Sequence, residues 1–229
     1  MIEDPPLVIR KAKVPRPSKK QLAAFKDVPT GFIADALGGR GALNYKIKPV
    51  VPSQSSICGV AVPIDCGPAD NLAIFMGLPH IQKGDVIVAA TDAFMATAVT
   101  GDLLLGMLRN LGAEGFVTDG AARDIVGIAD MGLPCFAAGI TPNSPVRNGP
   151  GTINLPVTCG GVAVGPGDIV VGDIDGVVIV PYAKINETIT RLEAVKAAEA
   201  QLLPRVQKGL GIPEFVKDLE KKVRVKVIP

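Results

Sequence analysis

Residues Val99–Gly127 have the sequence V-T-G-D-L-L-L-G-M-L-R-N-L-G-A-E-G-F-V-T-D-G-A-A-R-D-I-V-G, which is the most informative stretch for the fold. Its apolar run Asp102–Leu111 has helical spacing and stops at Gly112, as a helix with a glycine end would. Gly115–Thr118 follows as a short buried strand, and Ala122–Met131 as a second helix. This order of elements predicts a layered α/β fold.

The start of the first predicted helix is a candidate anion site. After Gly101 and Asp102, the free backbone amides of the first turn include those of Leu103, Leu104 and Leu105. Such amides form a positive pole that suits a carboxylate or a phosphate. Asp102 is ordinarily a helix cap at this position. Because its carboxylate would repel a bound anion, a metal-assisted site, with a cation between the two groups, is the alternative interpretation.

A second candidate feature is the Arg-Asp pair that ends the segment Thr118–Asp124. The ordinary interpretation is a capped helix with solvated charges. In the functional interpretation, the small residues before the pair let a ligand approach the backbone. Arg123 then forms paired hydrogen bonds to a carbonyl or carboxylate group, and Asp124 holds a divalent ion such as magnesium. The spacing alone leaves both interpretations open.

Composition restricts the partners of the protein. The chain has 229 residues, 48% of them hydrophobic, a net charge of +2, 4% aromatic residues and no Trp. It has neither the basic stripe nor the stacking residues that nucleic-acid binding needs, so we expect no nucleic-acid partner. The N-terminal region has no apolar stretch of signal-peptide length, and no later segment approaches a membrane span. We therefore expect a cytoplasmic protein that does not bind membranes.

Cysteine and histidine give no sign of a soft-metal site. Four cysteines lie far apart without a C-x-x-C motif, namely Cys58, Cys66, Cys135 and Cys159. They predict buried free thiols rather than disulfides or zinc ligands. His80 is the only histidine and is expected at the surface or at a helix end.

The chain divides into three predicted regions. Residues 1–29 form an N-terminal arm with a short helix, 30–183 an α/β core domain, and 184–229 a C-terminal helical extension. In the second half of the core, Pro156–Val164 is predicted as a strand. Lys184–Leu203 is predicted as a long amphipathic helix that suits packing on a neighbouring subunit.

Four phrases of the sequence carry a family resemblance. They are G-D-L-L at 101–104, D-G-A-A-R-D at 119–124, N-L-P-V-T-C-G-G at 154–161 and P-G-D-I-V-V-G-D-I-D-G-V-V-I-V-P at 166–181. Together they resemble the class II pyruvate aldolases that act on 4-hydroxy-4-methyl-2-oxoglutarate and 4-carboxy-4-hydroxy-2-oxoadipate, relatives of the regulator of ribonuclease E activity. The resemblance covers about Thr30–Leu203. It implies an αββα sandwich of the swivelling-domain type, assembled as homotrimers or homohexamers with sites at subunit interfaces.

The resemblance also assigns roles in substrate binding. The backbone amides that correspond to Leu103 and Leu104, with Gly101 and Leu105 beside them, would bind the pyruvyl carboxylate. Arg123 matches the arginine that holds the pyruvyl oxygens.

The metal roles follow from the same resemblance. Asp124 matches the direct ligand of Mg²⁺ or Mn²⁺, and Asp102 matches the acid that contacts the water shell of the ion. The family also takes an acidic residue from the C-terminal helix of a neighbouring subunit. Glu199 is the candidate by position, and its alternative is a solvated helix face paired with Lys196.

The implied reaction cleaves a 4-hydroxy-2-oxo acid to pyruvate and a second keto acid, a step of aromatic-compound degradation. The metal ion and Arg123 would polarise the 2-keto group and stabilise the pyruvate enolate. Oxaloacetate decarboxylation is the expected side activity because it yields the same enolate. A distal carboxylate of the substrate could meet Lys46, Lys48 or Arg147, and nothing local selects among them.

Two other functions remain as alternatives. The chain could be a non-catalytic regulator that binds a ribonuclease or another protein, or a related sugar-acid dehydratase. Asp119 and the C-terminal extension favour the enzyme, because we do not associate either feature with the regulators.

Overall fold

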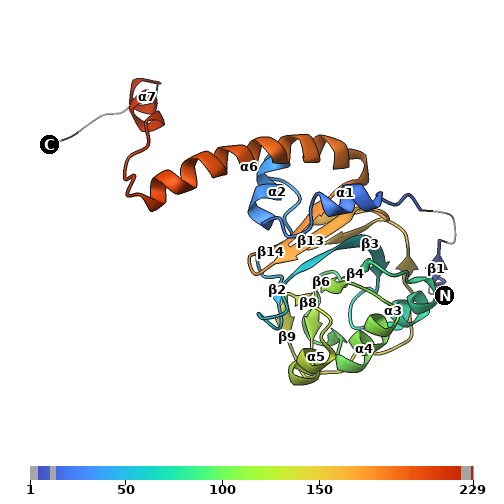
Figure 1. Cartoon of the computed structure of the whole chain (residues 1–229). Coiled ribbons are helices and arrows are strands. Elements are labelled where there is room, and N and C mark those ends of the chain that lie inside the picture. Colours follow the sequence, from blue (N-terminus) through green and yellow to red (C-terminus); the bar gives the residue numbers. More distant parts are fainter. Residues whose placement is uncertain (1–4, 11–13, 223–227, 229) are drawn as a thin grey trace. The chain divides into compact units, whose positions relative to one another are not determined.

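The computed structural model of the chain describes residues 5–10, 14–222 and 228 (Figure 1). Its central sheet contains β1 (Val8–Ile9), β2 (Lys48–Pro49), β3 (Ile57–Asp65), β4 (Asp85–Ala90), β6 (Gly115–Thr118), β8 (Cys135–Ala137), β10 (Thr152–Ile153), β13 (Ile169–Asp173) and β14 (Gly176–Val180). The strand order is β1-β10-β3-β4-β6-β8-β2, and β13 pairs with both β3 and β14. The α/β class predicted from the sequence is therefore confirmed.

Four neighbouring parallel strands, β3, β4, β6 and β8, form the centre of this sheet. Alternate residues of β4 point to opposite faces, as the period of a strand requires. Ile87 and Ala89 join one hydrophobic cluster, whereas Val86 and Val88 join a second. All six residues of β4 are buried, so the sheet is covered on both faces.

Helices α3 (Leu72–Gly77), α4 (Asp102–Asn110) and α5 (Ile125–Met131) cover one face of the sheet (Figure 1). The other cluster includes residues of the hairpin β11 (Val157–Cys159) and β12 (Val162–Val164), and of β13 and β14. Helix α2 (Thr30–Ala36) contacts β13 and β14. Helix α1 (Lys19–Ala23) begins with a capping box from Ser18, and the short 3-10 turns η1 (Leu78–His80) and η2 (Tyr182–Lys184) complete this part.

A small separate sheet lies where α4 and α5 begin. It consists of the parallel strands β5 (Ala98–Thr100), β7 (Ala121–Ala122) and β9 (Gly139–Ile140), in the order β5-β7-β9. Because β5 leads into α4 and β7 precedes α5, the pairing of these two strands brings the starts of both helices together.

The chain divides into two compact units, Met1–Leu192 and Glu193–Pro229. Helix α6 (Ile185–Gln207) belongs to both, and its buried residues Ile185, Thr188 and Leu192 lie in the first unit. The second unit also contains α7 (Phe215–Lys222). In the part of the chain that the structure describes, no helix has the length and apolarity to cross a membrane.

The predicted helix Ala122–Met131 is wrong at its start. Ala122 is the last residue of β7, and the helix begins only at Ile125. Asp124, immediately before it, has a left-handed backbone with φ of 61°. A helical residue cannot adopt this conformation, so the Arg-Asp pair lies in a tight connection instead of a helical turn.

Two further boundaries differ from the prediction. Pro156–Val164 is a hairpin instead of one strand, because Gly160 and Gly161 both have positive φ and reverse the chain. Helix α6 continues through Pro204 to Gln207, although a proline inside a helix removes a hydrogen bond and its ring crowds the carbonyl group four residues earlier.

All four cysteines are free thiols, as predicted. Cys66, Cys135 and Cys159 are buried, and Cys58 is half-buried. Burial raises the pKa of the Cys58 thiol to about 11 and that of the Cys135 thiol to about 12. Since the thiolate is the reactive form, these groups are inert near neutral pH.

Candidate functional site

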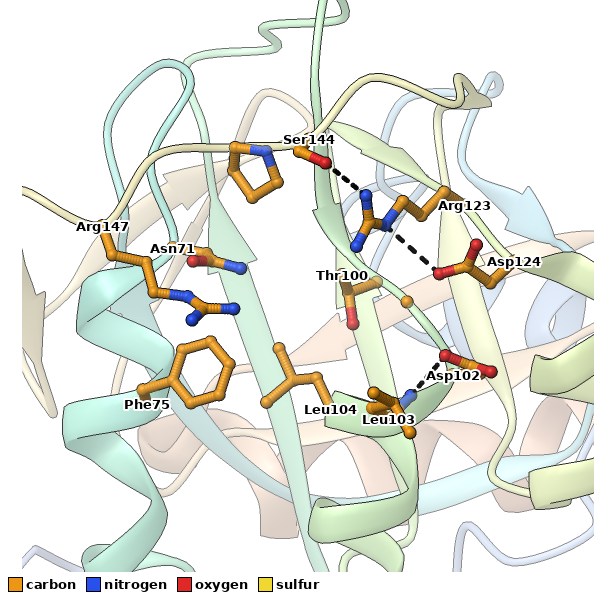
Figure 2. A pocket seen from close by; sticks show the side chains of 12 residues that line it. Asn71, Phe75, Thr100, Asp102, Leu103, Leu104, Arg123, Asp124, Ser144 and Arg147 are labelled. Carbon is orange, nitrogen blue, oxygen red and sulfur yellow. Dashed lines mark hydrogen bonds and ion pairs between the residues drawn. The ribbon is translucent and has the colours of Figure 1, made fainter.

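A cavity of about 190 Å³ lies at the start of α4, beside the connection from β7 to α5. Figure 2 shows the side chains on its wall. They come from α3 and the residue before it, from the β5–α4 junction, from the residues after β7 and from the loop after β9. The lining residues are Asn71, Phe75, Thr100, Gly101, Asp102, Leu103, Leu104, Arg123, Asp124, Ser144, Pro145 and Arg147.

One backbone hydrogen bond sets the frame of this cavity. The Arg123 amide donates to the Thr100 carbonyl oxygen at 3.1 Å, which joins the connection before α5 to the end of β5. In a continuous helix that oxygen would accept the Leu104 amide, four residues later. The Leu105 amide instead donates to Gly101 within the helix, at 3.1 Å, and the Leu105 side chain is buried in the core. The structure therefore places Leu104, but not Leu105, at the cavity.

Asp102 is the first residue of α4, and the N-cap position belongs to Gly101. One carboxylate oxygen of Asp102, Oδ1, accepts the Leu103 amide at 2.6 Å. An anionic ligand that used the same amide would compete with this carboxylate. Asp102 would then have to turn to another partner, and a cation is the natural one.

Two glycines make room for the two carboxylates of the site. A Cβ atom at Gly101 would lie 2.6 Å from Oδ2 of Asp124, although the extended backbone of Gly101 suits any residue. A Cβ atom at Gly127, on α5, would collide with Oδ2 of Asp102. Each carboxylate therefore packs directly against the backbone of the other helical segment, which only glycine permits at both positions.

Arg123 lies between a carboxylate and a hydroxyl group. Its Nε is 3.2 Å from Oδ2 of Asp124, and its Nη1 hydrogen-bonds to the Ser144 hydroxyl group. The side chains of Arg123 and Asp124 are 37% and 44% exposed, so solvent weakens their attraction and leaves both groups accessible to a ligand. Figure 2 shows both side chains on the same wall as Asp102.

Of the three basic residues predicted for a distal carboxylate, the structure brings only Arg147 to this cavity. Its guanidinium carbon lies 4.4 Å from the centre of the Phe75 ring, a cation–π contact that orients the side chain. Lys46 lines a different cavity, and Lys48 Nζ donates to the Asp175 carbonyl oxygen.

A buried carboxylate, that of Asp70, fixes the loop that carries Arg147. Its Oδ2 accepts the amides of Asn148 and Gly149, at 2.6 and 3.0 Å, and its Oδ1 accepts the Leu72 amide at 2.7 Å. The Asn71 amide donates to the Val146 carbonyl oxygen at 3.1 Å. The loop and the start of α3 are thereby joined beside the cavity.

The donor set of the cavity fits a hard divalent cation. Asp102 and Asp124 supply carboxylate oxygens, and magnesium is commonly held by one or two carboxylates with water as the remaining ligands. No group of three or more His, Cys, Asp and Glu side chains comes together within the described residues. The cavity has only two carboxylates. The residues present therefore suit Mg²⁺ or Mn²⁺ better than a metal that needs all of its ligands from the protein.

Asp119 is not among the residues that line the cavity. Glu199 is exposed on the part of α6 that belongs to the second unit. Lys196, its expected partner, contacts Glu193 at 3.5 Å. Asp119 is buried, and its Oδ1 accepts the backbone amide of Thr91 at 2.8 Å.

Several wall residues were not predicted from the sequence. Asn71, Phe75 and Thr100 have no motif of their own, and Ser144 lies in a stretch whose only signal is its richness in turn-forming residues. An acid just before an apolar run, Asp70 followed by Leu72, indicates a helix start here but gives no sign of a ligand site.

Comparisons with known proteins show the family to which the chain belongs. A family model described as RraA-like, Aldolase/RraA, matches residues 30–179, and the chain belongs to this family. A relative from Halalkalibacterium halodurans, named "Putative 4-hydroxy-4-methyl-2-oxoglutarate aldolase", is 36% identical over 176 residues, which cover 77% of this chain and 83% of the relative. The family resemblance predicted from the sequence is thus confirmed.

Solved structures show the same architecture. An uncharacterized protein from Pseudomonas syringae pv. tomato matches with a TM-score of 0.74 and 24% identity, over 86% of this chain and 97% of that one. RraAS2 of Streptomyces coelicolor, described as an unusual member of the RNase ES inhibitor RraA protein family, matches with a TM-score of 0.71 and 25% identity. That match covers 84% of this chain and all of the other, 100%. The family therefore includes proteins named as enzymes and as inhibitors.

The close contact at Gly101 gives a test of the carboxylate arrangement. In Gly101→Ala, the new methyl group must displace Asp124, so we expect the affinity for Mn²⁺, measured by calorimetry, to fall at least roughly tenfold. Gly31→Ala is the matched control, because nothing lies within 4 Å of a Cβ there and alanine favours its helix. Unchanged Mn²⁺ affinity in folded Gly101→Ala protein would count against Asp124 as a ligand.

Proposed function

We propose that the protein is a divalent-metal-dependent aldolase that cleaves a 4-hydroxy-2-oxo acid to pyruvate and a second keto acid. Substrates of this class include 4-hydroxy-4-methyl-2-oxoglutarate and 4-carboxy-4-hydroxy-2-oxoadipate. The observation that carries the proposal is the cavity itself, which combines the free end of α4, the Arg123 guanidinium and the carboxylates of Asp102 and Asp124. The name of the 36% identical relative supports the same reaction class.

The pyruvyl part of the substrate would lie against the start of α4. The amides of Leu103 and Leu104, next to Gly101, would hold its carboxylate, and Arg123 would donate hydrogen bonds to the 2-keto oxygen. Asp124 would hold Mg²⁺ or Mn²⁺, with Asp102 contacting the ion through water. The bound ion supplies Lewis-acid polarisation of the keto group.

In the proposed reaction, the bond between C3 and C4 breaks and its electron pair passes to the pyruvyl fragment as an enolate. The 4-hydroxyl group loses its proton and becomes the carbonyl group of the second product, and C3 of the enolate takes up a proton. Arg123 stabilises the charge that develops on the 2-keto oxygen. Oxaloacetate would lose carbon dioxide through the same enolate, which accounts for the proposed side activity.

Arg147 extends the site toward a second carboxylate. It is oriented by Phe75, and Asp70 fixes its loop, so its guanidinium group is held in place before a ligand arrives. Positioning of this kind lowers the entropy cost of binding. We therefore assign the distal carboxylate of the substrate to Arg147.

We further propose a homotrimer or homohexamer, with a site completed across the subunit interface. Large apolar side chains are exposed on the two helices beside the cavity, with Leu103 71% and Val126 80% accessible. These side chains are available for packing against a partner subunit. Glu199 of the partner subunit would then contact the water shell of the metal ion.

For the core, we propose the αββα sandwich of the swivelling-domain type, with the domain limits 1–29, 30–183 and 184–229. Helix α2 on β13 and β14, and helices α3 to α5 on the opposite side of the main sheet, support this arrangement.

A non-catalytic regulator is the second candidate, because RraAS2 is a structural neighbour at 25% identity. A sugar-acid dehydratase is a weaker third candidate, which rests only on the diversity of substrates within related folds. A regulator would release no pyruvate from any 4-hydroxy-2-oxo acid in the presence of magnesium.

The first test is pyruvate release from 4-hydroxy-4-methyl-2-oxoglutarate with Mg²⁺, with a chelator as control. We expect Arg123→Ala and Asp124→Asn each to lower kcat/KM at least roughly 100-fold, because each removes a charge at the reacting keto group. Arg109→Ala and Asp130→Ala are controls with exposed charges on the same two helices. Full turnover in folded Arg123→Ala or Asp124→Asn protein would overturn the site assignment.

Arg147 is tested by comparing two substrates. We expect Arg147→Ala to raise the KM for 4-hydroxy-4-methyl-2-oxoglutarate roughly tenfold, because a charge-assisted contact to the distal carboxylate is lost. The KM for 4-hydroxy-2-oxopentanoate, which has no second carboxylate, should change less than about twofold, and Lys46→Ala should affect neither. Equal changes for both substrates would contradict a role in carboxylate binding.

Glu199 is tested by complementation between subunits. Glu199→Ala and Asp124→Asn proteins, each inactive alone, are mixed under conditions of subunit exchange. If Glu199 acts on the neighbouring site, random assembly restores roughly one quarter of the sites, because each site takes one residue from each of two chains. Glu193→Ala, on the same helix, should be active without mixing. No recovery in verified mixed oligomers would exclude the shared site.

A further inference from the structure

Two polar atoms on the wall of the cavity have no hydrogen-bond partner in the described part of the chain: Oδ1 of Asn71 and Oγ1 of Thr100. Both residues are almost completely buried, with exposures of 5% and 3%. The one other such side-chain atom among the described residues is Oε1 of Gln54, which is not at this cavity. Since buried polar atoms are nearly always paired in native proteins, two in one small cavity indicate a ligand that pairs them.

The orientation of the Asn71 side-chain amide group is fixed by the hydrogen bond of its nitrogen atom, Nδ2. Nδ2 donates to the Val99 carbonyl oxygen at 3.2 Å, so a flipped amide would place two oxygens against each other. Oδ1 is therefore the atom left for the ligand, and it can only accept a hydrogen bond. The Thr100 hydroxyl group can both donate and accept.

The Asn71 oxygen, which can only accept, disfavours a carboxylate as the matching group. Carboxylate oxygens would be repelled by Oδ1 of Asn71, and the cavity has the start of α4 and the Arg147 guanidinium group to hold them instead. Figure 2 shows Asn71 and Thr100 on the wall between Arg123 and Arg147. A ligand with its keto group at Arg123 and its distal carboxylate at Arg147 would thus have its middle part beside Asn71 and Thr100.

We propose that Asn71 and Thr100 form a hydroxyl-binding subsite that recognises the alcohol group of a hydroxylated keto diacid. The ligand hydroxyl donates to Oδ1 of Asn71 and accepts from Oγ1 of Thr100. This inference rests on the proposed function, in which that alcohol is the 4-hydroxyl group of the substrate. The subsite then separates aldol cleavage from oxaloacetate decarboxylation, because oxaloacetate gives the same enolate but has no such hydroxyl group.

The kinetic test uses Thr100→Val, which keeps the shape of the side chain, and Asn71→Leu. We expect each variant to lower kcat/KM for 4-hydroxy-4-methyl-2-oxoglutarate roughly tenfold, the usual effect of deleting one hydrogen bond to a substrate. Oxaloacetate decarboxylation by the same variants should change less than about twofold. Gln54→Leu is the matched control, since it removes an unpaired buried oxygen elsewhere. Equal losses for both substrates in the cavity variants would overturn the subsite.

A binding test is independent of catalysis. Calorimetry compares succinate with both enantiomers of malate, which differ from succinate only by one hydroxyl group. We expect the wild-type protein to bind one malate enantiomer roughly tenfold more tightly than succinate, and Thr100→Val and Asn71→Leu to lose this preference while Gln54→Leu keeps it. Equal binding of succinate and both malates by the wild type, or a preference kept in both cavity variants, would overturn the inference. If the preference follows the subsite but the wild type releases no pyruvate, the proposed aldolase reaction fails and the hydroxyl subsite stands.

Discussion

The hydrogen bond from the Arg123 amide to the Thr100 carbonyl oxygen is the interaction on which the site depends. It joins β7 to β5 at the point where the chain leaves both strands, and thereby sets Arg123 beside Gly101. The same bond occupies the oxygen that the Leu104 amide would use in a longer helix, so the helix start keeps a donor for a ligand. A single backbone contact thus places a helix start with a free amide beside a guanidinium group.

The positions of the charged groups in the cavity follow from the close approach of the two helix starts. Asp102 and Asp124 reach the cavity because Gly127 and Gly101 have no side chains to displace them. The left-handed backbone of Asp124 is a conformation that Asp tolerates better than most residues, and it directs the carboxylate toward Arg123 instead of along α5. Two arginines and two aspartates then face one space. Opposite charges on one wall suit a ligand with carboxylates and a cation together, whereas a purely cationic pocket would suit any anion.

The sequence was sufficient to predict the parts of the fold in which apolar residues follow a regular pattern. The bounds of helix α4 and strand β6 were predicted to within one residue. The helical spacing of apolar residues extends over the whole of α4, and the run of buried residues extends over the whole of β6. The small sheet was missed because Ala121–Ala122 and Gly139–Ile140 are too short to alternate. Arg123 and Asp124 were recognised through the family phrase, while Asn71 and Arg147 come to the cavity through contacts of Asp70 that no local pattern contains. Long-range contacts of this kind depend on the tertiary fold and cannot be predicted from the sequence of a single segment.

Membership of a family whose proteins are named both as enzymes and as inhibitors does not separate the two functions, since the fold is common to both. The polar groups of the cavity are a better guide to which of the two functions applies. A protein that acts through its outer surface has no need of buried polar atoms that its own groups leave unpaired. Asn71 and Thr100 both carry such an atom, and both face the space between two arginines. Two such atoms in one cavity are expected where a ligand pairs them, which favours a small-molecule site over an inhibitor that uses only its surface.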